Sequence, residues 1–292
     1  MPEAGGSCGI HSEVAAQVGS SREATWIIEH ASRETGGDGP RTAELAWELA
    51  ARRAAGEPLQ YVLGTWSFRN LELAVDRRVL IPRPETEQVV EVALRHVIRM
   101  ASELPFEPSL VGVDLGTGSG AIALSLAAEV PTSVGWEIWA TDASTDALDV
   151  ARVNVTTLVA QRPDVADRVH LVQGSWFAAL PGDLMGRLDL VVSNPPYVAT
   201  HELGDLDPEV REWEPRSALV APRGASGVAG MADIESVIAG AGRWLRPGGA
   251  LVVELDPRQA YAAVDAARRA GFAKVGTARD LAGRLRMLEA VR

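Results

Sequence analysis

Val113-Asp114-Leu115-Gly116-Thr117-Gly118-Ser119-Gly120 is the stretch that decides the fold of this 292-residue chain. An apolar run ends in a loop with glycine at every second position, and a segment of helix formers follows at Ala121–Glu129. A strand that turns through glycines into a helix is typical of nucleotide-binding α/β sheets, because glycine permits a sharp turn and close approach of a ligand. The spacing also fits a dinucleotide loop with alanine at position 121, or a tight turn without a ligand.

From residue 110 onward, short apolar runs alternate with segments of helical pattern. We predict strands at Leu110–Leu115, Glu137–Thr141, His170–Gln173, Asp189–Ser193, Ala250–Leu255, Lys274–Arg279 and Arg286–Val291. We predict the intervening helices at Ala121–Glu129, Thr145–Thr157, Met231–Trp244 and Arg258–Ala270. The strands are continuous apolar runs, as in a parallel sheet that is covered on both faces. The pattern predicts a doubly wound, seven-stranded α/β domain over residues 83–292, which opens with a helix from Pro84 to about Met100.

The residues before this domain have a different character. We predict a loosely ordered leader over residues 1–22, a small helical domain over residues 23–60 and a β-hairpin linker over residues 61–82. The leader is rich in Gly, Ser and Ala, with a short helix near Glu13–Val18. Strong helix formers fill Ala43–Arg53, and Gly36–Pro40 has the composition of a turn. Arg69-Asn70 separates two β-prone stretches and is the expected hairpin turn.

Composition and charge narrow the class of protein. The single cysteine, Cys8, cannot form an internal disulfide, and the five histidines have no metal-ligand spacing, so we expect no metal site. No apolar run approaches the ~18 residues that span a bilayer, and the N-terminus has no signal-peptide pattern. We therefore expect a cytoplasmic protein that does not bind membranes. A net charge of −11 disfavours direct binding to nucleic acid and favours a protein or small-molecule substrate.

Two polar motifs follow predicted strands. Asp142 ends the second strand, where an acid accepts hydrogen bonds from ribose hydroxyls or serves as a helix N-cap. Ser193-Asn194-Pro195-Pro196-Tyr197 ends the fourth strand and is the most specific motif in the chain. Its prolines remove two N–H donors, which leaves the side-chain oxygen of Asn194 and the carbonyl of Pro195 as acceptors. Two acceptors that converge on one point suit an incoming NH₂ group, although a plain Pro-Pro loop is the alternative.

Together, the glycine loop and Asn-Pro-Pro-Tyr resemble the class I methyltransferases that modify amide or exocyclic nitrogens. The resemblance narrows to the protein-glutamine methyltransferases, and within them to the family that methylates the Gly-Gly-Gln motif of peptide-chain release factors. The stretches that carry it are Gly56–Gly64, Ile81–Glu87, Gly174–Phe177, Glu214-Pro215 with Ala218-Leu219, and Trp244–Gly249. It runs from about residue 45 to the C-terminus and is weak over the first 40 residues.

This resemblance implies a cofactor, a substrate and a set of site residues. The cofactor is S-adenosyl-L-methionine, and the partner is a release factor whose glutamine amide nitrogen receives the methyl group. The implied cofactor-binding residues are Gly116, Thr117, Gly118, Ser119, Gly120, Asp142, Trp176 and Asn194. The implied catalytic residues are Asn194, Pro195, Pro196 and Tyr197. Residues 23–60 would recognise the protein substrate.

The sequence also leaves alternatives and shows departures from the family pattern. A methyltransferase of a ribosomal-protein glutamine or of adenine N6 in nucleic acid has the same motif, and an NAD-dependent oxidoreductase or a non-catalytic cofactor-binding regulator belongs to another class. Three positions differ from the family pattern. Ser175 stands where an acid often precedes the tryptophan, residues 220–230 are longer than expected, and Leu255-Asp256-Pro257 replaces a common glycine.

Overall fold

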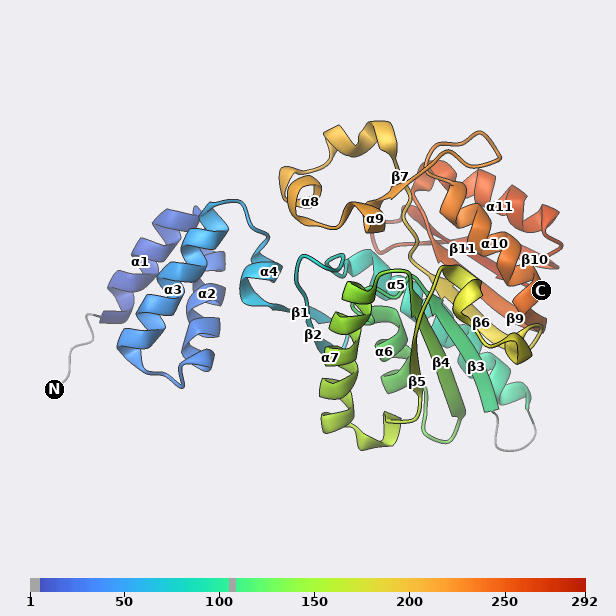
Figure 1. The fold of residues 1–292 in the computed structure, drawn as a ribbon, viewed down its shortest axis with the longest axis horizontal. Coiled ribbons are helices and arrows are strands. Elements are labelled where there is room, and N and C mark those ends of the chain that lie inside the picture. Colours follow the sequence, from blue (N-terminus) through green and yellow to red (C-terminus); the bar gives the residue numbers. More distant parts are fainter. Residues whose placement is uncertain (1–5, 105–108) are drawn as a thin grey trace.

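The computed structural model describes residues 6–104 and 109–292. Three helices form a unit at the N-terminus, and a larger α/β body follows (Figure 1). The helices are α1 Gly6–Val18, α2 Ser21–Glu34, α3 Gly39–Ala54, α4 Leu59–Leu63, α5 Pro84–Glu103, α6 Ala121–Glu129, α7 Thr145–Gln161, α8 Pro208–Trp213, α9 Arg216–Leu219, α10 Ala232–Trp244 and α11 Ala260–Arg269. The strands are β1 Thr65–Phe68, β2 Leu71–Ala74, β3 Ser109–Leu115, β4 Gly135–Asp142, β5 Val169–Gln173, β6 Leu188–Ser193, β7 Val198–Ala199, β8 Val220–Ala221, β9 Leu245–Glu254, β10 Lys274–Arg279 and β11 Leu285–Val291.

The central sheet has seven strands in the order β10-β11-β9-β6-β3-β4-β5, which confirms the predicted doubly wound α/β domain. Strands β5, β4, β3, β6 and β9 are parallel, whereas β11 runs antiparallel between β9 and β10. The chain builds β3, β4 and β5 in one direction and then returns to place β6 on the other side of β3. This reversal creates a switch point at the carboxyl ends of β3 and β6, where open α/β sheets bind ligands.

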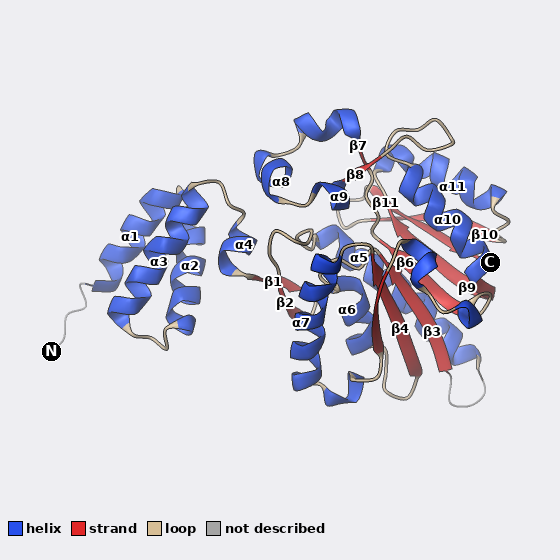
Figure 2. Cartoon of the chain, in the orientation of Figure 1, coloured by secondary structure: helices blue, strands red, loops and turns tan. Residues whose placement is uncertain are grey.

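Helices cover both faces of the sheet (Figure 2), and alternation along each strand divides the core between these faces. Leu190 and Val192 pack with α5 and α6 on one face, whereas Val191 packs with α10 and α11 on the other. Both faces are therefore apolar and covered, which is why the strands read as continuous hydrophobic runs in the sequence.

The N-terminal unit corrects the prediction of a loosely ordered leader. Helix α1 covers residues 6–18, and residues 1–5 lie outside the described part of the chain. Ile10, Val14 and Val18 are spaced four residues apart, so they form one apolar stripe on the helix. Val14 is fully buried against α2 and α3. The Gly/Ser/Ala composition concealed this stripe.

The hairpin and most other elements lie where the sequence predicted them, although helix α7 extends four residues past its predicted end at Thr157. Strand β1 pairs with β2 and turns at Arg69, which has a positive φ of 51°. Strand β9 begins at Leu245, five residues before the predicted start, because a register shift between Leu188 and Leu190 accommodates the Pro-Gly-Gly stretch. Helix α11 begins at Ala260, after a short 3₁₀ turn at Pro257–Gln259. Residues 198–221, for which no element was predicted, form β7, a 3₁₀ helix, α8, α9 and β8.

No helix within residues 6–104 and 109–292 combines the length and the apolar character needed to cross a membrane.

Candidate active site

A cavity of about 520 Å³ lies at the carboxyl edge of the sheet, at the switch point. Strand register explains how its residues meet. Leu115 pairs with Thr141 on one side and Ser193 on the other, and Ser193 pairs with Val253. The residues that follow these positions therefore emerge at the same edge. They are Gly116, Asp142, Asn194 and Glu254.

The glycine loop bends at positions that favour glycine. Gly116, Gly118 and Gly120 have φ values of 74°, 57° and 86°, in the left-handed region that other residues rarely adopt. The backbone N–H of Gly118 donates to Asp142 Oδ2 at 2.9 Å, and that of Ser144 donates to Oδ1 at 2.9 Å. Asp142 therefore fixes the loop from the neighbouring strand while it lines the cavity.

Asp114, just before the loop, is a buried carboxyl group. Its Oδ2 accepts hydrogen bonds from the Thr117 hydroxyl at 2.7 Å and the Ala123 N–H at 3.2 Å, which caps helix α6. Its Oδ1 has no hydrogen-bond partner within residues 6–104 and 109–292. Burial raises the pKa of Asp114 to about 7, and the hydrogen bonds from Thr117 and Ala123 only partly oppose this shift.

Trp176 lines the cavity in a conformation that is rare for a residue other than glycine. Its φ is 47°. The ring lies over Gly116, where a Cβ would be 3.6 Å from the nearest ring atom. The cavity thus has one flat aromatic side next to the glycine loop. Ser175, which precedes Trp176, also lines the cavity and is exposed.

Asn194 joins the cavity to a buried hydrogen-bond chain. Its Nδ2 donates to Thr86 Oγ1 at 3.1 Å, and the Thr86 hydroxyl donates to Glu254 Oε2 at 2.7 Å. Thr86 comes from the first turn of α5, and Glu254 ends β9. Neither Asn194 Oδ1 nor the Pro195 carbonyl accepts a hydrogen bond from any described residue. Asn194 lines the cavity, so its Oδ1 is available to a ligand there, whereas Pro195 is buried beside it.

Tyr197 faces the same buried carboxylate. Its hydroxyl donates to Glu254 Oε1 at 3.4 Å, and its backbone carbonyl accepts from Gln259 Nε2 at 2.9 Å. Burial raises the pKa of Tyr197, and the negative charge of Glu254 adds to the effect. The phenol therefore stays protonated at neutral pH.

A strap formed by residues 198–221 borders the cavity. Glu214, which precedes α9, is buried and accepts hydrogen bonds from the Arg83 guanidinium and the Ile81 backbone N–H. Burial raises the pKa of Glu214, whereas the charge of Arg83 opposes the shift. Pro215, Ser217 and Ala218 of the strap line the cavity, as Arg83 does. The ion pair therefore joins the segment before α5 to the strap.

The structure brings most of the predicted site residues to one cavity. Those that line it are Gly116, Thr117, Gly118, Ser119, Asp142, Trp176, Asn194 and Pro196. Gly120, Pro195 and Tyr197 belong to the same loops but do not line the cavity, and their assigned roles stay predictions.

Sequence reasoning assigned no role to several polar residues of the site. Thr86 and Glu214 belong to stretches that carry the family resemblance, whereas neither Glu254 nor Asp233 of α10 was singled out. Thr86 and Asp233 line the cavity, and Glu254 bonds Thr86 from behind it. The polar Thr86 on the mostly apolar buried face of α5, where His96 is the other polar residue, is a signal that could have drawn attention to it.

Comparison with known proteins agrees with this geometry. Residues 99–206 match the family described as the methyltransferase small domain. The chain is 40% identical over 283 residues to the release factor glutamine methyltransferase of Gloeobacter violaceus, which covers 94% of this chain and 89% of that protein. It is 41% identical over 263 residues to the protein of that name from Bordetella pertussis, which covers 90% and 87% of the two chains.

The chain belongs to the release factor glutamine methyltransferase family. Among solved structures it is similar to a ribosomal protein L11 methylase from Lactobacillus delbrueckii subsp. bulgaricus, with a TM-score of 0.45 and 16% identity over 73% of this chain and 81% of that one. So low a similarity adds no argument about function.

As a member of this methyltransferase family, the chain is not an NAD-dependent oxidoreductase, although its glycine loop fits that spacing as well. Within residues 6–104 and 109–292, no group of three or more His, Cys, Asp or Glu side chains is placed to hold a metal ion.

Proposed function

We propose that this chain transfers a methyl group from S-adenosyl-L-methionine to the side-chain amide nitrogen of the glutamine in the Gly-Gly-Gln motif of peptide-chain release factors. The family assignment supports the substrate class. The pair of acceptors at Asn194 Oδ1 and the Pro195 carbonyl, neither of which is bonded by a described residue, carries the proposal, because a primary amide offers two N–H donors. Translation termination would place the reaction in the cytoplasm.

The residues at the cavity fit the proposed cofactor. The glycine loop leaves open space around Gly118, where a Cβ would meet no atom within 4 Å. Asp142 is positioned to accept from ribose hydroxyls, and the Trp176 ring offers a flat apolar surface for adenine. When bound, S-adenosyl-L-methionine supplies an activated methyl group on its sulfonium. We propose these residues as its binding site.

The protein's own part in the reaction is to hold and aim the amide. Asn194 Oδ1 and the Pro195 carbonyl would each accept one N–H, which fixes the plane of the amide and directs its nitrogen at the methyl carbon. Alignment of this kind contributes up to ~7–11 kcal/mol in favourable cases. The amide nitrogen held in this way would accept the methyl group that bound S-adenosyl-L-methionine would supply, and the electron pair of the broken S–C bond would stay on the sulfur. As positive charge develops on nitrogen the two acceptors bind more strongly, and one N–H proton then leaves to water.

The test is methyl transfer from labelled cofactor to a purified release factor, compared with a release factor in which the Gly-Gly-Gln glutamine is alanine. We expect label on the first protein and none on the second. Label on both would place the modification at another residue. Label on neither would remove the release-factor assignment, and ribosomal protein and nucleic acid would then be tried. The net charge of −11 disfavours nucleic acid among these.

A further inference from the structure

A series of hydrogen-bonded side chains leads from the cavity into the core. Contact with the cofactor or the substrate does not explain why these polar groups are buried there. The series consists of the Asn194 amide, the Thr86 hydroxyl and the Glu254 carboxyl, at 3.1 Å and 2.7 Å. Glu254 is 1% exposed and Thr86 is 4% exposed, so both groups are removed from water. Buried polar groups of this kind are costly unless every member is paired in a defined direction.

The charge on Glu254 determines which atom donates and which accepts in each of these hydrogen bonds. An ionised carboxylate only accepts hydrogen bonds, so the single hydroxyl proton of Thr86 must point at Glu254 Oε2. Thr86 Oγ1 can then only accept from Asn194, which requires the Nδ2 end of that amide. Oδ1 is left without a partner among the residues that the structure describes.

We propose that Glu254 and Thr86 are positioning residues that fix the Asn194 amide in the one orientation that presents its oxygen to the substrate. The proposal rests on the proposed function, in which Asn194 Oδ1 accepts an N–H of the substrate amide. With the amide reversed, Nδ2 would face the substrate NH₂, and two donors would repel each other. Asn is symmetric in shape, so packing cannot make this choice and a directed hydrogen bond is needed.

The same carboxylate also holds the last residue of the motif. Glu254 Oε1 accepts from the Tyr197 hydroxyl at 3.4 Å. One buried group thus reaches both ends of Asn-Pro-Pro-Tyr, through Thr86 at one end and directly at the other. Strand pairing makes this possible, because Ser193 of β6 is opposite Val253 of β9. Asn194 and Glu254 are the next residues of the two strands.

Protonation of Glu254 would allow the Asn194 amide to adopt either orientation. A neutral carboxyl can donate to Thr86 Oγ1, which frees the Thr86 proton for either end of the Asn194 amide. Burial raises the pKa of Glu254 to about 7. Glu85 of α5 also raises it, whereas the hydrogen bonds from Thr86 and Tyr197 and the positive charge of Arg286 on β11 lower it. Activity should therefore decrease as the pH is lowered and Glu254 gains its proton.

The kinetic test compares Thr86→Val with Thr86→Ser. We expect Val, which has no hydroxyl, to lower kcat about 100-fold while cofactor affinity stays within about twofold. The Thr86→Ser variant keeps the hydroxyl, and its kcat should stay within a few-fold of the wild-type value. Thr157→Val is the matched control, because Thr157 is an exposed threonine of α7 that bonds only its own helix. Equal loss in the Val and Ser variants would overturn the proposal.

A second kinetic test uses Glu254→Gln. We expect kcat at pH 8 to fall about tenfold, as for loss of one directed hydrogen bond. The decline of wild-type activity between pH 8 and pH 6 should be absent from this variant, an effect that a merely structural loss would not produce. An unchanged pH profile in Glu254→Gln would contradict the proposal.

A spectroscopic test does not depend on the identity of the substrate. The chain has only three asparagines, at positions 70, 154 and 194, so ¹⁵N labelling of asparagine gives a simple spectrum. We expect the Asn194 side-chain NH₂ signals to shift with pH as Glu254 titrates, and to stay still in Glu254→Gln. Asn154 is the internal reference, because its Nδ2 donates to the carbonyls of Ala74 and Ser119 instead.

The two kinds of failure are distinguishable. If the wild type does not methylate a release factor but the Asn194 signals follow Glu254, the proposed substrate is wrong and the positioning chain stands. If the wild type is active but the Asn194 signals do not shift as Glu254 titrates, Glu254 and Thr86 do not position Asn194, and the proposed function stands.

Discussion

Asp142 shows how one side chain serves the loop and the cavity together. Both of its carboxyl oxygens accept backbone N–H groups, from Gly118 and Ser144, and each keeps a second lone pair. The carboxylate thus shapes the glycine loop before any ligand arrives. Arranging the site in advance in this way reduces the ordering that binding must impose.

Replacing Asp142 with Ala should therefore weaken cofactor binding through both effects. We expect the Kd to rise more than tenfold, because a charged acceptor contributes about 1.5–3 kcal/mol per hydrogen bond. Calorimetric titration with S-adenosyl-L-methionine measures this change. Asp149→Ala is the control, since Asp149 is an exposed residue of α7 that pairs only with Arg152. A Kd within twofold of the wild type would remove Asp142 from the binding site.

Asn194→Ala tests the acceptor that the proposed mechanism requires. We expect turnover to be lost while cofactor binding stays near that of the wild type, because Asn194 acts on the substrate amide. Methyl transfer and cofactor titration measured on the same preparation separate the two. Asn70→Ala, at the exposed hairpin turn, is the matched control. Substantial turnover in Asn194→Ala would contradict the mechanism.

Asp114 makes stability depend on pH. Its pKa is about 7 in the folded protein, above the 3.8 of a free carboxyl, so the folded state keeps a proton that the unfolded state has released. Stability therefore falls as pH rises from about 4 to about 7, and the full cost of the buried carboxylate is present above that range.

Asp114→Asn removes this titration and should flatten the decline. We expect the variant to gain stability relative to the wild type as pH rises from 5 to 8, by up to about 3 kcal/mol at 1.36 kcal/mol per pKa unit. Urea unfolding at several pH values measures the difference. Glu254 titrates in both proteins and cancels in the comparison. A constant difference across this range would show that Asp114 is ionised throughout.

At the scale of elements, the loop before α10 packs against the backbone of the Asn-Pro-Pro-Tyr turn. Gly230 is buried with a φ of 71°, and a Cβ there would lie 2.1 Å from the Tyr197 carbonyl oxygen and 2.8 Å from Gln259 Nε2. The Gln259 amide holds the carbonyls of Tyr197 and Ala229 together. The longer stretch over residues 220–230 thus packs on the turn that presents Asn194.

Gly230→Ala should displace the backbone of Tyr197 and lower kcat about 100-fold, since a shift of 1 Å in a positioning group can cost that much. Gly227→Ala is a close control: it has a φ of 81° but no atom within 4 Å of its Cβ. The control carries the backbone strain without the collision. Methyl transfer by the two variants isolates the collision, and equal activities would show that the contact does not support the site.

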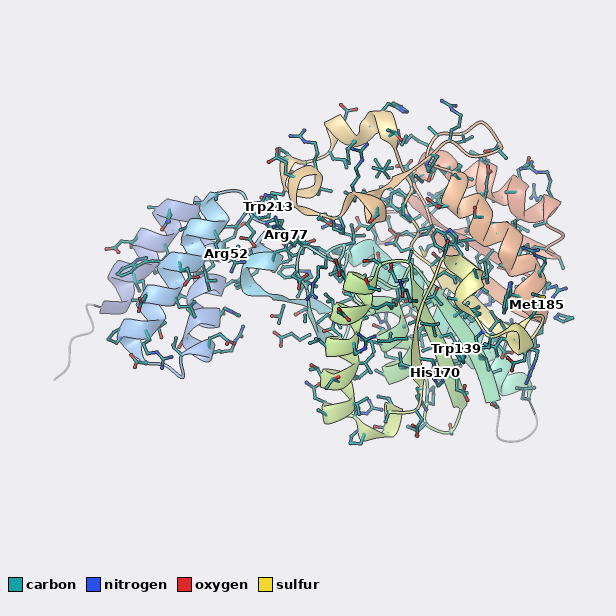
Figure 3. All side chains as sticks on the ribbon, in the orientation of Figure 1. Arg52, Arg77, Trp139, His170, Met185 and Trp213 are labelled. Atoms are coloured by element: carbon teal, nitrogen blue, oxygen red, sulfur yellow. The ribbon has the colours of Figure 1, made fainter. Side chains whose placement is uncertain are left out.

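At the scale of the whole molecule, an arginine joins the N-terminal helices to the strap. Arg53 of α3 pairs with Glu23 of α2 at 2.6 Å and with Glu209 of α8 at 2.7 Å. Nearby, the Arg77 guanidinium lies 5.5 Å from the ring centroid of Trp213, at the end of α8. Figure 3 shows Arg52, Arg77 and Trp213 together at this junction. The helical unit is therefore connected to a segment that borders the cavity.

Glu209→Gln should loosen this junction and leave the cofactor site intact. We expect KM for the protein substrate to rise several-fold, kcat and cofactor Kd to change little, and stability to fall by no more than about 1 kcal/mol, as for a partly exposed ion pair. Steady-state kinetics and thermal unfolding provide the measurements. Glu212→Gln on the same helix is the control, because Glu212 pairs only with its neighbour Arg211. An unchanged KM would argue against a part for the junction in substrate recognition.

Much of the molecule could be predicted because its signals are local. The glycine loop, the apolar strands and Asn-Pro-Pro-Tyr each lie within a few consecutive residues, and the seven-stranded sheet follows from their order. Only the second half of helix α1 was predicted, near Glu13–Val18, because its stripe of Ile10, Val14 and Val18 is sparse and is buried only against α2 and α3. The strap was missed because its elements are too short to show a period.

The sequence by itself determined the α/β fold, the place of Asn-Pro-Pro-Tyr after its strand and the edge of the sheet where the cavity lies, because strand ends and glycine turns depend on contiguous residues. Only the tertiary structure decided what lies behind that motif. Thr86 and Glu254 are 168 residues apart. Their hydrogen bond exists because α5 packs on β9 and because β9 pairs with β6. A carboxyl group buried by such packing acquires its altered pKa and its directing role from its surroundings, which no local pattern contains.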